Sequence, residues 1–232
     1  MFRLLFHLSV LVLNTSCLFY YLIYLDHPLP AKGMKTFPLN GKSIYLAIWC
    51  MTLQIVYYLF ALLNDIVGTN ASTKSPPIIR RIKDVLFTLA LPLAIYVTAL
   101  VYITCAIDPA MLAPVEAFSI IPPIINQVLH TTISLFIIIE LLLPHKNYPT
   151  RKFGLLLLYS FILIYIVWFS YIYRTTGAGV YPFYDYLDVY GRVFFLMVSI
   201  IAFYIFYIVS EQTNRFICSK NSTILNVKNK KN

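Results

Sequence analysis

The chain has 232 residues, of which 60% are hydrophobic and only 12% are charged, and its formal net charge is +9. A soluble domain needs a charged, hydrated surface that this composition could not easily supply, so lipid is the expected solvent. The basic residues are spread among the segments between apolar runs and are not gathered on one soluble face, which argues against a nucleic-acid partner.

Six stretches are long and apolar enough to cross a bilayer, whose hydrocarbon core of roughly 30 Å requires about 20 residues of helix. They predict an all-α transmembrane fold, a bundle of about six membrane-spanning helices. The connecting segments are too short for a separate soluble domain, so we expect residues 1–232 to form a single six-span domain with a basic C-terminal tail over about 210–232. In chain order the expected spans are Leu4–Leu25, Ser43–Leu63, Leu86–Ile107, Ile124–Leu143, Gly154–Tyr173 and Val193–Val209.

The distribution of basic residues favours one orientation in the membrane. With six spans, the N-terminus, the second and fourth connections and the tail share one side, which holds 13 of the 18 Lys and Arg residues. The positive-inside rule places that side, and with it both termini, in the cytosol. The tail ends in Lys228-Asn-Lys230-Lys-Asn, which resembles a dilysine retrieval signal of endoplasmic-reticulum proteins. A basic tail attracted to anionic lipid headgroups is the alternative interpretation.

The common soluble-enzyme motifs are missing from the sequence. It contains no Gly-rich phosphate loop, no paired metal-ligand spacing and no Gly-flanked nucleophilic Ser. The four cysteines have no paired spacing of the kind that indicates zinc or a disulfide framework. We therefore expect no metal and no cofactor, and the sequence indicates no particular protein partner.

A polar stripe interrupts the fourth predicted span. Asn126, His130 and Ser134 are spaced by four, so they share one helix face, and Gln127 lies beside them. Buried polar groups of this kind either join helices or line a water-filled or substrate-binding cavity. The second possibility is concrete because an imidazole can accept and return a proton near neutral pH.

Four acidic residues lie near the cytosolic ends of the predicted spans: Asp65, Asp84, Glu140 and Glu211. An unpaired charge in hydrocarbon costs at least a few kcal/mol, so each requires a partner. Basic residues lie at the same predicted depth, and we expect these to neutralise the acids: Arg80, Arg81, Lys83, Arg151 and Lys152.

Across nearly its whole length the chain resembles the family of the androgen-induced protein and the androgen-dependent TFPI-regulating protein. Its members are multipass membrane proteins of the endoplasmic reticulum and cell surface. The most specific block is Asn126-x-x-x-His130-Thr131, which continues to Glu140. Further matches are Gln54, Asp65, Asp84, Tyr148-Pro149-x-Arg151-x-x-Gly154-Leu155, Thr176-Gly177, Val180-Tyr181-Pro182-Phe183, Glu211 and Asn214.

The resemblance implies a hydrolase that cleaves fatty-acid esters of hydroxy fatty acids with a Thr nucleophile on the second span and a His on the fourth. His130 matches the family His. The position of the Thr, six residues after Gly41 and seven before Gln54, is occupied here by Ala47. A methyl group cannot attack an ester, so the sequence poses the question of whether catalysis survives.

Two functions stay open. The first is a membrane-embedded lipid-ester hydrolase with His130 as general base, Asn126 or Gln127 as supporting groups, and Ser43 as replacement nucleophile; Ser134 or water activated by His130 are its variants. The second is a catalytically inactive lipid-binding or regulatory protein of the same fold. Either would have a membrane lipid or fatty-acid ester as partner and would lie in the endoplasmic reticulum, the endomembrane system or the cell surface. A transporter or channel subunit ranks last, because the halves show no repeat.

Overall fold

The structure is a computed structural model that describes residues 2–68, 76–143 and 147–229, with side chains given up to residue 219. The described residues contain helices and no strand, and six of the helices are long and apolar enough to span a membrane. The all-α transmembrane prediction is confirmed, and the chain is an integral membrane protein. Of the three lysines of the tail motif, Lys230 and Lys231 lie outside the described residues, and Lys228 falls where side chains are not described.

Five spans are continuous helices, and the fourth is composite: it joins a short α-helix, one turn of π-helix and a second α-helix. The continuous helices are α1 (Phe2–Tyr24), α2 (Leu46–Val67), α3 (Ile78–Ile107), α7 (Arg151–Thr176) and α8 (Val189–Asn229). The fourth span consists of α5 (Pro123–Gln127), the π-helix η4 (Val128–Thr132) and α6 (Ile133–Leu142). Short connecting elements are η1 (Lys32–Thr36), η2 (Lys42–Ile44), η3 (Pro109–Met111), α4 (Val115–Ile120) and η5 (Pro182–Tyr186).

The second span begins at Leu46, three residues later than the predicted start at Ser43. The chain reverses just before it, with Leu39, Asn40 and Gly41 all at positive φ. A Cβ on Gly41 would lie 2.5 Å from the carbonyl oxygen of Met34, so only glycine fits this turn. Residues 42–44 then form the 3₁₀ turn η2, and α2 starts only after it.

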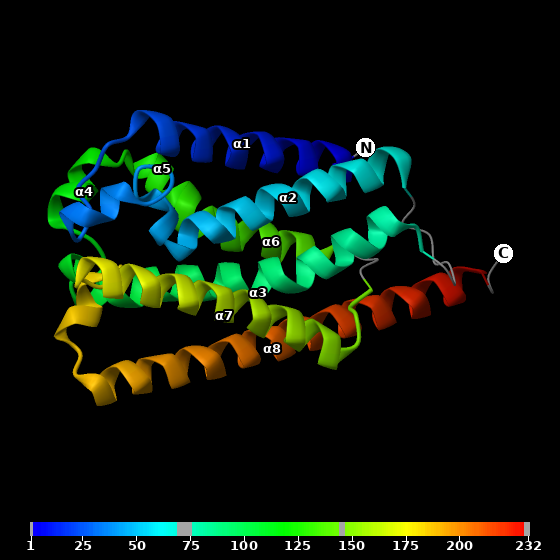
Figure 1. Cartoon of the computed structure of the whole chain (residues 1–232). Helices are drawn as coiled ribbons and strands as arrows, with labels where there is room; N and C mark the ends of the chain where they lie inside the picture. The colour runs from blue at the N-terminus through cyan, green and yellow to red at the C-terminus, as the bar shows by residue number, and fades with distance from the viewer. Residues whose placement is uncertain (1, 69–75, 144–146, 230–232) are drawn as a thin grey trace.

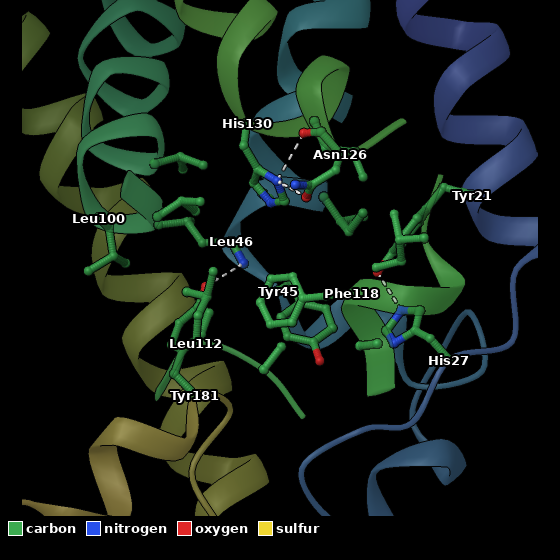
Figure 2. Close-up of a pocket in the computed structure, with 18 residues that line it drawn as sticks. Tyr21, His27, Tyr45, Leu46, Leu100, Leu112, Phe118, Asn126, His130 and Tyr181 are labelled. Atoms are coloured by element: carbon green, nitrogen blue, oxygen red, sulfur yellow. Dashed lines mark hydrogen bonds between the residues drawn. The ribbon is translucent and has the colours of Figure 1, made fainter. Parts of the chain in front are cut away.

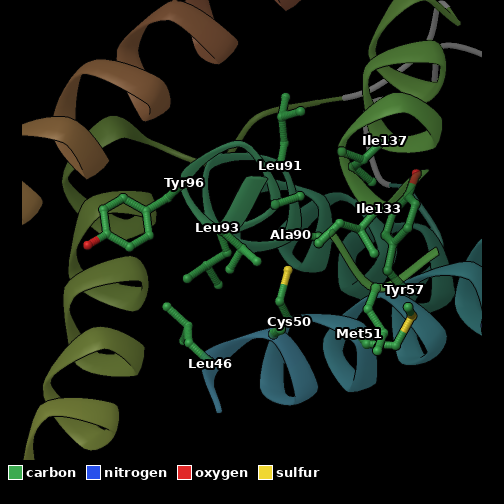
Figure 3. Packing of buried hydrophobic residues seen from close by; sticks show 14 of the residues in the cluster. Leu46, Cys50, Met51, Tyr57, Ala90, Leu91, Leu93, Tyr96, Ile133 and Ile137 are labelled. Carbon is green, nitrogen blue, oxygen red and sulfur yellow. The ribbon is translucent and has the colours of Figure 1, made fainter. Parts of the chain in front are cut away.

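The six spans run side by side, with both termini at one end of the bundle and the short elements α4 and α5 at the other (Figure 1). Helix α3 is central, because it packs against α2, α6, α7 and α8. Its buried Ala90 and Ala94 are small enough to allow close helix approach. Figure 3 shows Cys50 and Met51 of α2 near the buried side chains of α3, with Ile133 of α6 completing the layer.

At the end with the termini, a buried histidine joins three spans. His7 of α1 places Nδ1 2.7 Å from the Asp65 carboxylate of α2 and Nε2 2.8 Å from the Glu140 carboxylate of α6. Neutral imidazole carries one N–H, so the cluster holds either an imidazolium or one protonated carboxyl group. The expectation that Arg and Lys side chains would serve as the partners of all four acids therefore missed the part played by His7.

The other two acids do contact the expected basic residues. Asp84 lies 3.4 Å from Lys83 Nζ and 3.9 Å from Arg80 Nε, and Glu211 lies 2.7 Å from Arg151 Nε. These pairs allow the charged residues to be buried. Helix α3 begins at Ile78, eight residues before the predicted start of the span, and so includes Asp84.

We predict that His7→Ala lowers the free energy of unfolding by about 3–5 kcal/mol, because it leaves two buried carboxylates without the group between them. Thermal unfolding of the purified protein in detergent micelles measures the loss. Ser9→Ala, on the exposed side of the same helix, is the matched control. Equal stability of the two variants would show that the cluster contributes little.

Candidate functional site

A cavity lies inside the end of the bundle opposite the termini (Figure 2). We call it the inner chamber. Its walls are mostly apolar, and a few polar side chains converge on it from distant parts of the sequence, as is typical of small-molecule sites. Its lining includes Tyr21, His27, Tyr45, Leu46, Ala47, Leu100, Asn126, Leu129, His130 and Tyr181.

His130 presents a proton acceptor to the inner chamber. Its Nδ1 lies 2.8 Å from the side-chain oxygen and 3.1 Å from the backbone oxygen of Asn126. Both oxygens can only accept, so Nδ1 carries the hydrogen and Nε2 has the free lone pair. No described residue forms a hydrogen bond with Nε2. The geometry is that of a histidine held in the tautomer of a general base.

His130 lies in the π-helix η4, which other spans support. A π-helical turn disturbs the regular pairing of backbone carbonyls, and such turns are frequent at functional sites. The Thr98 hydroxyl of α3 donates to the backbone carbonyl of His130, and Gln54 Nε2 of α2 donates to the Ile133 carbonyl at 2.7 Å. Ser134 donates to the Ala94 carbonyl at 2.8 Å. Ser134 thus supports the π-helix from behind and does not line the inner chamber.

Ala47 and His130 both line the inner chamber. Ser43 is elsewhere. It belongs to η2 and lines a separate groove together with Trp49 and Thr52. Its carbonyl accepts hydrogen bonds from the indole nitrogens of Trp49 and Trp168. The late start of α2 places Ser43 in this turn, so the predicted replacement nucleophile does not line the inner chamber with His130.

Among the residues that line the inner chamber there is no Ser, Thr or Cys, and its hydroxyl groups come from three tyrosines. Tyr21 donates to His27 Nε2 at 2.6 Å, while His27 Nδ1 donates to the Pro28 carbonyl at 3.0 Å. Burial lowers the pKa of His27, which agrees with this neutral tautomer. The chamber therefore offers no ordinary covalent nucleophile.

The other two tyrosine hydroxyls differ in their pairing. The Tyr181 hydroxyl accepts a hydrogen bond from the backbone nitrogen of Leu46 at 3.3 Å. The Tyr45 hydroxyl is buried and has no hydrogen-bond partner among the described residues. Buried tyrosine hydroxyls usually find a partner, so Tyr45 is available to donate to a polar atom of a bound molecule.

His130 and Asn126 also line a second, more open space, which we call the outer groove; its other lining residues include Val101, Tyr102, Cys105, Phe118 and Gln127. Tyr102 and Gln127 are exposed, and both approach Thr131, whose hydroxyl donates to Gln127 Oε1 at 2.6 Å. Gln127 therefore belongs to the groove side of the helix. His130 stands where a molecule arriving from the surface would reach the inner chamber.

Four lining residues were missed from the sequence as site candidates: Tyr21, His27, Tyr45 and Tyr181. Each lies at or beyond the end of a span, where tyrosines are common in any membrane protein because they favour the lipid headgroup boundary. Of these four residues, Tyr181 alone had a signal in the sequence, because it belongs to the Val180-Tyr181-Pro182 match.

Comparisons with known proteins agree with the resemblance noted from the sequence. The family model described as FAR-17a/AIG1-like protein matches residues 2–215. The androgen-dependent TFPI-regulating protein of Rattus norvegicus is 30% identical, and that of Mesocricetus auratus 29%, each over 88% of this chain and 93% of the relative. The androgen-induced gene 1 protein of Homo sapiens is 28% identical over 77% of this chain and 78% of its own. No solved structure matches.

Proposed function

The chain belongs to the FAR-17a/AIG1-like family, and on that premise we propose that it is a membrane-embedded hydrolase of fatty-acid esters. The observation that carries the proposal is His130, a base with a fixed tautomer whose free nitrogen adjoins an apolar chamber. The apolar walls suit an acyl chain, and the esters of hydroxy fatty acids implied by the family resemblance are the proposed substrate class.

Since Ala47 provides no hydroxyl, water is the proposed nucleophile. Nε2 of His130 accepts a proton from the water as its oxygen attacks the ester carbonyl, and Asn126 keeps the Nδ1–H oriented. The buried Tyr45 hydroxyl can donate to a second polar atom of the substrate, farther along the inner chamber. The intermediate then expels the alkoxide, which takes the proton back from His130, and a fatty acid and an alcohol are released.

The alternative is a protein that binds a fatty-acid ester or related lipid without cleaving it. Ala47, and the absence of Ser, Thr and Cys from the lining of the inner chamber, favour this candidate. In that case the unpaired Tyr45 hydroxyl and His130 Nε2 would serve as donor and acceptor for the polar group of the bound lipid.

We expect His130→Ala to lower kcat for hydrolysis of a hydroxy-fatty-acid ester by about 10²- to 10⁴-fold, the usual contribution of a positioned base. The purified protein in detergent, assayed by release of free fatty acid, provides the measurement. Thr132→Ala changes the same π-helix at a residue that does not line the inner chamber and should leave kcat unchanged. Equal activity of wild type and His130→Ala would contradict the role of the base.

We also expect Ala47→Thr to raise ester cleavage and to introduce labelling by a fluorophosphonate probe, because it places a hydroxyl in the chamber that His130 lines. Ala47→Val adds a similar volume without the hydroxyl and should gain neither property. Overpacking costs about 1–3 kcal/mol, so gel filtration in detergent must show that both variants fold.

The Ala47 variants also decide between the two candidate functions. If neither wild type nor folded Ala47→Thr protein hydrolyses the ester while both bind it, the lipid-binding protein is the correct assignment. Labelling of Ala47→Val to the same extent as Ala47→Thr would show that the probe reacts with another residue.

For the cellular location we propose the endoplasmic reticulum or connected endomembranes, with both termini cytosolic. Support comes from the 13 basic residues on the side that holds the termini and from the position of both termini at one end of the bundle. The inner chamber then faces the lumenal leaflet.

A C-terminal epitope should therefore react with antibody once the plasma membrane alone is permeabilised. Reaction only after the internal membranes are opened would reverse the orientation. Replacement of Lys228 and Lys230 by Ser in the same tagged chain should shift the protein toward the cell surface if the tail acts in retrieval, and should leave its location unchanged if the tail only contacts lipid.

A further inference from the structure

A second apolar cavity lies beside the inner chamber between α3, α7 and α8. We call it the back chamber; Ile162, Ile166, Phe169, Leu196 and Phe203 are among its lining residues.

Three of the hydroxyl groups that line the back chamber, those of Tyr96, Tyr165 and Ser199, are paired within the protein. Ser199 donates to the Phe195 carbonyl at 2.8 Å, so the 2.7 Å contact between Ser199 and Tyr96 has the Tyr96 hydroxyl as donor. Tyr165 donates to the Ile44 carbonyl at 2.9 Å. A buried water needs two to four polar partners, and these groups provide few. In a membrane protein the abundant apolar molecule of suitable shape is a hydrocarbon chain.

The two chambers share a wall formed by Leu46, Leu100 and Tyr181. In Figure 2 these three side chains lie at the left, opposite Tyr21 and His27, with His130 above. In this wall the Tyr181 hydroxyl accepts a 3.3 Å hydrogen bond from the backbone nitrogen of Leu46. A chain that extends from His130 across the inner chamber meets this wall, and the back chamber lies beyond it.

We propose that the back chamber receives the distal part of a long acyl chain whose ester group lies at His130, and that Leu46, Leu100 and Tyr181 form the partition the chain must pass. The inference rests on the proposed function for the position of the ester group. It adds a second binding site and assigns the selection of chain length to the partition.

Chain length gives the test, because each added methylene packs against protein only while the cavity has room for it. In a series of p-nitrophenyl esters from hexanoate to octadecanoate, kcat/KM measured in detergent should rise with chain length until the available space is full. Ile166→Trp on α7 and Leu196→Trp on α8 each fill the back chamber from a different wall. In both variants the rise should stop at a shorter chain, while the hexanoate ester is hydrolysed as in wild type.

Leu163→Trp is the matched control, since Leu163 lies on α7 but is 61% exposed, and its profile should follow wild type. Two filling variants protect the test against a folding defect in one of them, which gel filtration would reveal. If folded Ile166→Trp and Leu196→Trp proteins both keep the wild-type profile, the back chamber does not hold the chain.

A readout without hydrolysis separates this inference from the proposed function. An octadecyl ether that carries a diazirine at the end of its chain cannot be hydrolysed, and after illumination its attachment sites are mapped by mass spectrometry. Attachment to Ile166, Phe169 or Leu196 supports the back chamber even if no ester is cleaved. Attachment confined to residues of the inner chamber, or to the exposed surface, would overturn it.

Discussion

Polar groups in hydrocarbon must be paired within the protein, and the arrangement of this bundle follows from that constraint. The imidazole of His7 joins the carboxylates of Asp65 and Glu140 across three spans. The Thr98 hydroxyl and the Gln54 amide satisfy carbonyls around the π-helix of the fourth span. At the opposite end, His130 Nε2 and the buried Tyr45 hydroxyl line the inner chamber without a hydrogen-bond partner among the described residues.

The two ends of the bundle therefore have different roles: one fixes the spans relative to one another, and the other forms the inner chamber. The end with the termini holds the buried acids and their basic partners, which fix the spans relative to one another. The opposite end holds short helices and turns, and these bring side chains from five distant segments to the inner chamber. Rigid helices at one end and irregular segments at the other agree with the general tendency of binding residues to lie on loops held by a scaffold.

Much of this could be predicted from hydropathy and spacing. Each predicted span coincides with one of the six spans, although α3 begins eight residues earlier and α8 continues past the predicted end at Val209. The four-residue spacing of Asn126 and His130 correctly predicted that they are neighbours. The place of Ser43 could not be predicted, because it depends on the turn at Gly41, which delays the start of α2. The role of Ser134 could not be predicted either, since a π-helix breaks the four-residue repeat. His7 was missed because its partners lie 58 and 133 residues away.

The π-helix at Val128–Thr132 also has a consequence for how the fourth span can vary. A π-helical turn corresponds to one residue more than a regular α-helix, and one residue rotates everything after it by about 100°. Without that residue, a straight helix with Glu140 directed at His7 would turn His130 away from the inner chamber. The extra residue thus sets the rotation of one half of the span relative to the other about the helix axis. Deletion of a single residue there would therefore damage the inner chamber far more than most substitutions, because a substitution leaves the directions of His130 and Glu140 unchanged.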